Sequence, residues 1–176
     1  AVKQKFPDTV LIIAPRHPER FDEVASLLRQ TGLPWVRKTM LAASSGNPAH
    51  DIILLDTIGE LAKVYSLGTV IFIGGSLVPV GGHNVLEPAV FRKPVLFGGF
   101  MSNFSEIAKI LKRRNAACQV HDRDEFIGRM LALLADSGLR RRIGEAAFTV
   151  IEENTGAVRK SVDHLDRLLR EGVRKY

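Results

Sequence analysis

Short apolar runs rich in branched residues alternate along the chain with longer segments whose apolar residues recur at helical spacing. The short runs have the composition of buried strands. They predict strands at 9–14, 35–38, 51–55, 69–73, 94–97 and 116–120. The longer segments predict helices at 19–31, 59–66, 84–91, 103–114, 123–136, 139–152 and 156–170. The stretch 42–50, rich in Ser, Gly, Asn and Pro, predicts a loop.

Mostly apolar strands separated by helices indicate a parallel sheet covered by helices on both faces. This order is typical of a doubly wound, Rossmann-like α/β fold. The length of 176 residues suits one domain, and no repeat or linker appears before the C-terminal helices. We therefore predict one domain over residues 1–176. Because the chain starts with AVKQKFPDTV rather than with Met, we expect it to be a piece of a longer protein.

Three loops that follow predicted strands have unusual polar or glycine content. They are APRHPER at 14–20, DTIGEL at 56–61 and GGSLVPVGGHN at 74–84. In doubly wound folds, ligands bind beyond the carboxyl ends of the strands. We therefore expect the fold to bring these loops to one edge, where they form a ligand site.

The glycine-rich loop 74–84 has the features of an anion site. Gly74 and Gly75 directly follow a strand, while Gly81 and Gly82 precede the predicted helix. Glycine permits positive φ and lets backbone N–H groups approach a ligand closely, and a helix start favours phosphate. The spacing matches neither the dinucleotide GxGxxG motif nor a P-loop, which argues against hydride transfer to NAD.

Four side chains in and after this loop are candidates for ligand contact. The hydroxyl of Ser76 can donate either to a ligand or to its own turn. Asn84 suits the N-cap of the following helix, and His83 can present an imidazole to a phosphate. Glu87 lies one helical turn further and can accept hydrogen bonds from both hydroxyls of a ribose. Compensation of the helix dipole is the alternative role of Glu87.

The loop after the first strand contains Arg16 and His17 between Pro15 and Pro18. An arginine guanidinium is a planar fork that suits a carboxylate or a phosphate. The two prolines restrict the loop, so we expect Arg16 to be held ready for a ligand.

The DTIGEL segment after the third strand first indicates a helix start. Asp56 or Thr57 can act as the N-cap, with Glu60 in the position of a capping box. A further contact of Ile58, Gly59 and Glu60 with a base or a phosphate is left open.

The net charge of +6 allows nucleic acid, an anionic membrane or a phosphorylated small molecule as the partner. Basic residues cluster at 109–114, 140–142 and 167–175, acidic residues at 122–125, 163 and 166 lie between these clusters, and no aromatic residues are interleaved. This pattern does not predict a nucleic-acid groove. Solvated helix faces and an anionic membrane surface remain open.

The cysteine and the histidines of the chain do not indicate a further reactive or metal site. Cys118 is the only cysteine and lies in an apolar string, so we expect a buried thiol rather than a nucleophile. The five histidines are scattered without metal-ligand spacing, and we expect neither a metal nor a cofactor. No run approaches the roughly 18 apolar residues of a membrane span.

Five segments in order resemble the C-terminal half of the 3-deoxy-D-manno-octulosonic acid (Kdo) transferases. They are APRHPER at 14–20, DTIGEL at 56–61, FIGGSLVPVGGHNVLEPA at 72–89, KPVLFG at 93–98 and SNFSEI at 102–107. The resemblance implies a GT-B glycosyltransferase that transfers Kdo from CMP-Kdo to a lipid A precursor, with inversion and without a metal. It also implies work at the cytoplasmic face of the bacterial inner membrane. Gly98–Gly99 stands where a Gly-Pro is expected, which implies a looser loop there.

The resemblance also implies roles for individual residues. Arg16 with Pro15 would lie by the Kdo and its phosphate, Ile58–Glu60 near the nucleotide, and Glu87 at the cytidine ribose. The full donor-binding set is Pro15, Arg16, His17, Ile58, Gly59, Glu60, Gly74, Gly75, Ser76, Gly82, His83, Asn84 and Glu87. The general base and the acceptor site belong to the family's N-terminal domain, so this chain alone is expected to bind the donor without transferring sugar.

Two alternatives come from other classes. One is the donor domain of a GT-B transferase or epimerase that uses a UDP-sugar, in which an acidic residue also contacts the ribose. The other is a basic module that binds a membrane surface or nucleic acid.

Overall fold

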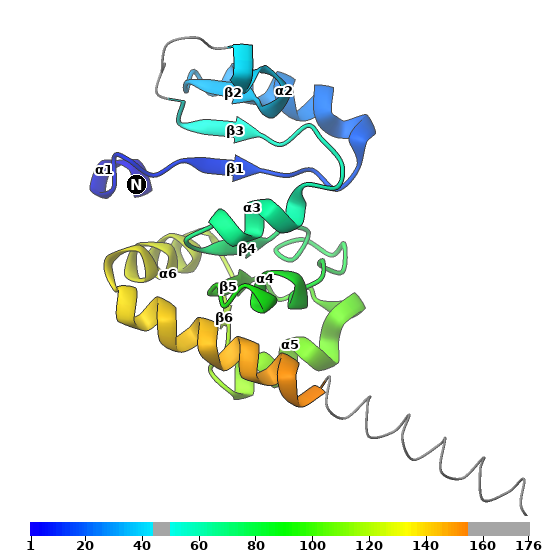
Figure 1. Cartoon of the computed structure of the whole chain (residues 1–176), viewed down its shortest axis with the longest axis vertical. Helices are drawn as coiled ribbons and strands as arrows, with labels where there is room; N and C mark the ends of the chain where they lie inside the picture. The colour runs from blue at the N-terminus through cyan, green and yellow to red at the C-terminus, as the bar shows by residue number, and fades with distance from the viewer. Residues whose placement is uncertain (44–49, 155–176) are drawn as a thin grey trace, which may run out of the picture. The chain divides into compact units, whose positions relative to one another are not determined.

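The computed structural model describes residues 1–43 and 50–154, in which parallel strands and helices alternate (Figure 1). The chain divides into two compact units, residues 1–64 and residues 65–176. The loop predicted at 42–50 and the helix predicted at 156–170 fall largely or wholly outside the described residues.

The first unit is built on a three-stranded parallel sheet in the order β1-β3-β2. Its strands are β1 (Leu11–Ile13), β2 (Trp35–Arg37) and β3 (Ile52–Leu54). Its helices are α1 (Val2–Lys5), η1 (Pro18–Arg20), α2 (Phe21–Gln30) and η2 (Lys38–Ala43). Helix α2 packs Ala25 and Leu28 onto Ile52 and Leu54 of the central strand. All three strands run the same way, so the loops after them leave from one edge of this sheet.

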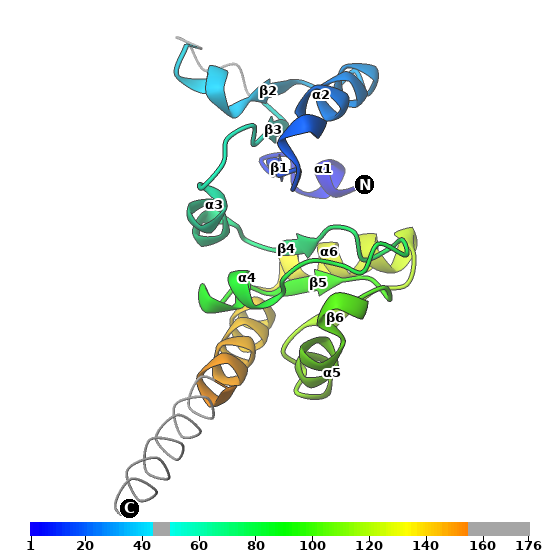
Figure 2. The same ribbon diagram turned by 90° about the vertical axis from the view of Figure 1, so that its right-hand side faces the viewer.

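The second unit has a three-stranded parallel sheet in the order β4-β5-β6. Its strands are β4 (Ile71–Ile73), β5 (Val95–Phe97) and β6 (Cys118–Gln119). Helices α4 (Leu86–Val90), η3 (Ser102–Phe104), α5 (Ser105–Arg113) and α6 (Arg123–Ala135) follow the strands, and a further helix covers the described residues 137–154 (Figure 2). Helix α3 (Leu61–Leu67) crosses the boundary between the two units.

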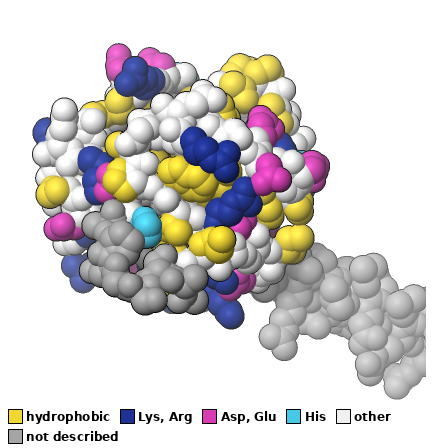
Figure 3. All heavy atoms as spheres, turned by 90° about the horizontal axis from the view of Figure 1, so that it is seen from above, with side chains coloured by type: hydrophobic (Ala, Val, Ile, Leu, Met, Phe, Trp, Pro, Cys, Tyr) yellow, Lys and Arg dark blue, Asp and Glu magenta, His cyan; other side chains and the backbone are white. Residues whose placement is uncertain are grey.

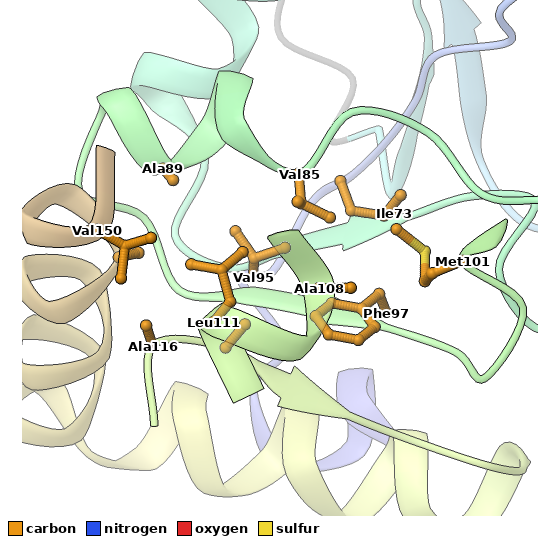
Figure 4. Close-up of a cluster of buried hydrophobic side chains, with 12 residues drawn as sticks. Ile73, Val85, Ala89, Val95, Phe97, Met101, Ala108, Leu111, Ala116 and Val150 are labelled. Carbon is orange, nitrogen blue, oxygen red and sulfur yellow. The ribbon is translucent and has the colours of Figure 1, made fainter. Parts of the chain in front are cut away.

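Strand β5 is buried on both faces, which explains its uninterrupted apolar sequence. Val95 and Phe97 point into the larger core, where side chains of α4, α5 and the helix 137–154 meet (Figure 4). Leu96 points the other way, into a second cluster with Leu133 of α6. Helices therefore cover both faces of this sheet, as the sequence predicts.

The turn between α4 and β5 anchors the helix 137–154. Arg92 has φ of 54°, and its guanidinium lies 4.0 Å from the ring centroid of Phe148 and 2.8 Å from the Glu145 carboxylate. A Cβ on Gly144 would stand 1.9 Å from the carbonyl oxygen of Arg92. Glycine at position 144 thus lets the helix approach the turn at backbone distance.

The strands lie within the ranges predicted for them. Some predicted helix starts are wrong. The helices predicted from 59 and 84 begin at Leu61 and Leu86. Gly59 has φ of +85°, outside the helical region, so it cannot start α3. The helix predicted from 103 begins at Ser105, because Asn103 lies inside the turn η3. One domain over 1–176 stays a prediction.

No helix within the described residues is both long and apolar enough to cross a membrane.

Candidate functional site

The glycine loop after β4 is closed on itself. The N–H of Gly82 donates to the carbonyl of Gly75 across 3.0 Å. Gly75, Gly81 and Gly82 have φ of +67°, +97° and +69°, which L side chains rarely adopt. The two glycine pairs identified in the sequence therefore form the two ends of one compact loop.

This loop packs against the segment that follows β5. The Phe100 N–H donates to the carbonyl of Ser76 across 2.8 Å, and a Cβ on Gly98 would stand 2.1 Å from the same oxygen. A Cβ on Gly82 would stand 2.3 Å from the Met101 sulfur. Gly98 is thus required by the close approach of the two backbones, and the contact there is tight rather than loose.

Ser76 stabilises the glycine loop through internal hydrogen bonds. Its side chain is fully buried, donates to the carbonyl of Ile73 across 2.5 Å and accepts from the N–H of Gly98 across 2.8 Å. Of the two roles left open for this hydroxyl, the structure shows the internal one. The bonds join the end of β4 to the end of β5 and hold the loop between them.

The imidazole of His83 lies beside the start of the loop. Its Nε2 would be 3.5 Å from a Cβ on Gly75, and the side chain is half-buried. The ring therefore lies against the half-buried backbone of Gly75, where only hydrogen stands in place of a side chain. An imidazole and a left-handed glycine at one point are suited to an anionic group.

Asn84 and Glu87 form a pair at the start of α4. The Leu86 N–H donates to Asn84 Oδ1 across 2.9 Å, and Asn84 Nδ2 donates to Glu87 Oε1 across 3.1 Å. Asn84 is therefore not the N-cap residue, which is Val85, although its side chain makes the capping bond. Glu87 is exposed, and burial together with the Glu87 charge raises the pKa of Tyr65 on α3 to about 12.

In the first unit, Asp56 ties the end of β3 to the end of β2. Its carboxylate accepts from the Thr39 N–H across 3.0 Å and from the Thr39 hydroxyl across 2.7 Å. Burial opposes the charge, yet these bonds and Arg37, 3.7 Å away, lower the pKa of Asp56. Of the two caps left open for α3, Asp56 is excluded, because Thr39 of η2 takes up its carboxylate and α3 begins only at Leu61.

The turn Ile58–Glu60 is also bound by a residue that directly follows β2. Lys38 Nζ lies 2.8 Å from Glu60 Oε1 and 2.6 Å from Oε2, and the Thr57 hydroxyl donates to the same carboxylate. The Lys38 bond, then the Thr57 bond, lower the pKa of Glu60. Ile58 is 79% exposed, so the turn presents an apolar side chain to solvent.

Arg16 and His17 follow β1 and are exposed, and Pro15 is half-buried. His17 Nδ1 lies 3.4 Å from the carboxylate of Glu19. Because β1 and β3 are parallel, Arg16 and the turn Ile58–Glu60 leave the same edge of this sheet. The convergence predicted for these two loops is confirmed, whereas their convergence with the glycine loop stays a prediction.

No protein-family model matches the chain. The chain is 37% identical over 174 residues to the 3-deoxy-D-manno-octulosonic acid transferase of Haemophilus influenzae, covering 98% of this chain and 40% of that protein. It is 39% identical over 126 residues to a bifunctional glycosyltransferase/methyltransferase of Fusobacterium nucleatum, covering 72% of this chain and 20% of that protein. The crystal structure of the C-terminal CMP-Kdo binding domain of WaaA from Acinetobacter baumannii matches with a TM-score of 0.75 and 36% identity, covering 81% of this chain and 73% of that chain.

The chain belongs to the Kdo transferase family. The structural match confirms the predicted α/β, Rossmann-like fold of a GT-B C-terminal half. The chain spans about 40% of the length of its Haemophilus influenzae relative.

Two residues of the candidate site were not identified from the sequence. Lys38 holds the turn Ile58–Glu60, and Tyr65 lies close enough to Glu87 for the carboxylate to shift its pKa. Lys38 follows the second strand, and all strand ends of a parallel sheet share one edge, so this loop belonged with those after β1 and β3. Tyr65 has no comparable sequence signal, because its place beside α4 depends on tertiary packing.

The cysteine, the possible metal ligands and the basic residues of this family member were the other candidates for chemistry. Burial raises the pKa of the Cys118 thiol, which disfavours the reactive thiolate. Within residues 1–43 and 50–154, no group of three or more His, Cys, Asp and Glu side chains is arranged to hold a metal. Figure 3 shows Lys and Arg interspersed with acidic and apolar side chains on the face that it displays. Several of the basic residues are in ion pairs, which fits solvated helix faces.

Proposed function

We propose that this chain binds CMP-Kdo and supplies the donor site of a Kdo transferase. The observation that carries the proposal is the closed glycine loop, with His83 against Gly75 and with the Asn84–Glu87 pair directly after it. The structural relative named as a CMP-Kdo binding domain supports the choice of ligand.

The phosphate of the donor would lie at the glycine loop. Positive φ at Gly75 turns the backbone without a Cβ in the way of a ligand, while the Gly82 N–H closes the loop by donating to the Gly75 carbonyl. His83 lies at the same point and adds a donor, or a positive charge when it is protonated. Gly74, which is exposed, would contribute through its backbone, whereas the buried Ser76 would support the loop from inside through its hydroxyl.

The cytidine ribose would bind Glu87. A carboxylate has about four acceptor positions, and Asn84 occupies one of them. The remaining positions suit the two vicinal hydroxyls of a ribose. Asn84 orients the carboxylate before the ligand arrives, which reduces the entropy lost on binding.

The loops of the first unit carry the other residues that we propose as donor contacts. Arg16, with Pro15 and His17, offers an exposed guanidinium for the phosphate or the Kdo carboxylate. The exposed Ile58 offers an apolar surface to the base, and Gly59 leaves the backbone of that turn accessible. Lys38 neutralises Glu60, so the acidic turn does not repel the nucleotide.

In the longer relatives this donor site would serve transfer of Kdo to a lipid A precursor at the cytoplasmic face of the inner membrane. The general base and the acceptor site would come from the part of those proteins that this chain does not match. We therefore expect the isolated chain to bind CMP and CMP-Kdo without transferring sugar.

Calorimetric titration with CMP, UMP, UDP and GDP tests the proposal. We expect CMP to bind more tightly than the other three, and Glu87→Gln to weaken CMP binding roughly tenfold through loss of charge-assisted bonds to the ribose. Glu152→Gln, which removes an exposed carboxylate from the last helix, is the matched control and should bind CMP like the unaltered chain. Tighter binding of UDP than of CMP would instead favour a UDP-sugar enzyme.

A further inference from the structure

A hollow of about 430 Å³ lies beyond the carboxyl ends of β5 and β6, and none of the residues expected to bind the donor lines it. Its walls include Gly81 of the glycine loop, the segment 99–102, the first turns of α5, and Gln119 at the end of β6. We call it the α5 hollow. Small-ligand sites have volumes of about 300–1,000 Å³ and, in Rossmann-like folds, lie beyond the carboxyl ends of strands.

The polar side chains that line the α5 hollow can all donate hydrogen bonds. They are the hydroxyls of Ser102 and Ser105, the ammonium groups of Lys109 and Lys112, and the amide of Gln119. No Asp or Glu is among its described lining residues. Such a set suits a ligand group that only accepts, because every donor then finds a partner.

Lys112 and Gln119 act together in this wall. Lys112 Nζ donates to Gln119 Oε1 across 2.6 Å, which engages the amide oxygen. Gln119 Nε2 lies 3.8 Å from where a Cβ on Gly99 would stand, and both residues line the hollow. The Lys112 ammonium group thus orients the Gln119 amide. The N–H groups of this amide then lie on the side of the hollow next to Gly99, from which no side chain projects.

Lys109 is partly engaged. Its Nζ lies 2.7 Å from the Glu106 carboxylate, and both side chains are largely exposed. An exposed pair of this kind contributes little to stability, so a bound anion can compete for the ammonium. The hollow therefore has one lysine held by a neutral amide and a second held only by a weak surface pair.

We propose that the α5 hollow binds the phosphate group of a second ligand, with Lys112 and Gln119 as its main donors. A phosphate carries three strong acceptor oxygens, which matches a wall of several donors better than a single carbonyl does. Phe97 and Ala108 line the hollow too and give an apolar surface to the carbon part of the ligand. The inference goes beyond the donor site and does not depend on it.

Heteronuclear NMR of the nitrogen-labelled chain tests this. Sodium phosphate is titrated at constant ionic strength against chloride, with CMP present to occupy the donor site. We expect saturable shifts of the Gly99 and Ser102 amides and of the Gln119 side-chain amide. Lys112→Gln should weaken phosphate binding roughly tenfold, because a charge-assisted bond is lost. Lys93→Gln, which removes a lysine before the amino end of β5, should leave it unchanged.

A second titration separates a free phosphorylated ligand from a lipid headgroup. Phosphatidylcholine vesicles with and without phosphatidylglycerol replace the phosphate. Shifts at the same three groups that depend on phosphatidylglycerol and on Lys112 would assign the phosphate to a lipid. Absence of saturable shifts with both probes, or equal shifts in Lys112→Gln, would overturn the proposal. If CMP fails to bind, the donor proposal fails, while the phosphate titration still reports on the hollow.

Discussion

The amide of Asn84 donates a hydrogen bond to the carboxylate of Glu87 across 3.1 Å, while its oxygen accepts from the backbone of Leu86. One side chain therefore both starts α4 and orients the carboxylate proposed to hold the ribose. The two functions depend on different atoms of the same amide, so they can be separated by substitution.

Asn84→Asp keeps the oxygen that accepts from Leu86 but replaces the donor with a second negative charge beside Glu87. We expect α4 to persist, because Asp also caps helices, and CMP binding to weaken roughly tenfold. Calorimetry gives the dissociation constant, and circular dichroism the fold. Gln30→Glu adds the same charge at the end of α2 and should leave CMP binding unchanged. Equal effects of the two substitutions would show that net charge, rather than the Asn84–Glu87 bond, decides affinity.

Asp56 links folding stability to pH. Its folded-state pKa is lowered, against the effect of burial, by Thr39 and Arg37, so its charged form stabilises the fold. That contribution is fully present above the ordinary Asp pKa of about 4 and is lost as pH falls through the lowered folded value. We expect Asp56→Asn to reduce the free energy of unfolding at neutral pH by about 1–3 kcal/mol.

Urea unfolding of both chains across the acid range measures this difference. The gap between the unaltered chain and Asp56→Asn should narrow as pH falls below about 4. Asp8→Asn, on the exposed segment before β1, is the control and should show no such gap. A difference that stays constant with pH would mean that packing, and not the charge of Asp56, accounts for it.

The internal role of Ser76 leads to a different prediction. Ser76→Ala leaves the buried N–H of Gly98 without its acceptor, at a cost of about 1–3 kcal/mol. We expect the thermal midpoint to fall, while the CMP affinity of the folded chain changes less than twofold. Calorimetry below the thermal midpoint separates the two effects. A tenfold loss of CMP affinity with an unchanged midpoint would instead assign the hydroxyl to the ligand.

The glycines of the loop were identified from the sequence because their conformations have a strong local cause. Gly75, Gly81 and Gly82 all have positive φ, which few other residues adopt, and they occur at the ends of predicted elements. The order of strands and helices followed from periodicity in the same way. Both signals are local, so a single sequence contains them.

The partners of polar side chains could not be predicted in this way. Asp56 and Glu60 have the spacing of a helix start, yet Thr39 and Lys38 take up their carboxylates from 17 and 22 residues away. Ser76 had two equally good local roles, and the burial that decides between them arises only when β5 packs beside β4. Long-range pairing of this kind depends on tertiary structure, which local patterns do not contain.

The closest backbone approach in the candidate site is at Gly98, where a Cβ would stand 2.1 Å from the carbonyl oxygen of Ser76. Gly98→Ala must push the glycine loop away from the end of β5, and the atom in the way is backbone that cannot rotate aside. We expect a loss of about 1–3 kcal/mol or more in the free energy of unfolding, together with weaker CMP binding, because the same loop carries Gly75 and His83.

Gly128→Ala in α6 is the matched control: no atom lies within 4 Å of its Cβ, so alanine should be neutral or stabilise the helix by up to about 1 kcal/mol. Urea unfolding and calorimetry on both variants measure the two effects. If Gly98→Ala unfolds at the same urea concentration as Gly128→Ala and binds CMP equally well, the loop does not need this close approach, and its proposed role as a rigid phosphate site fails.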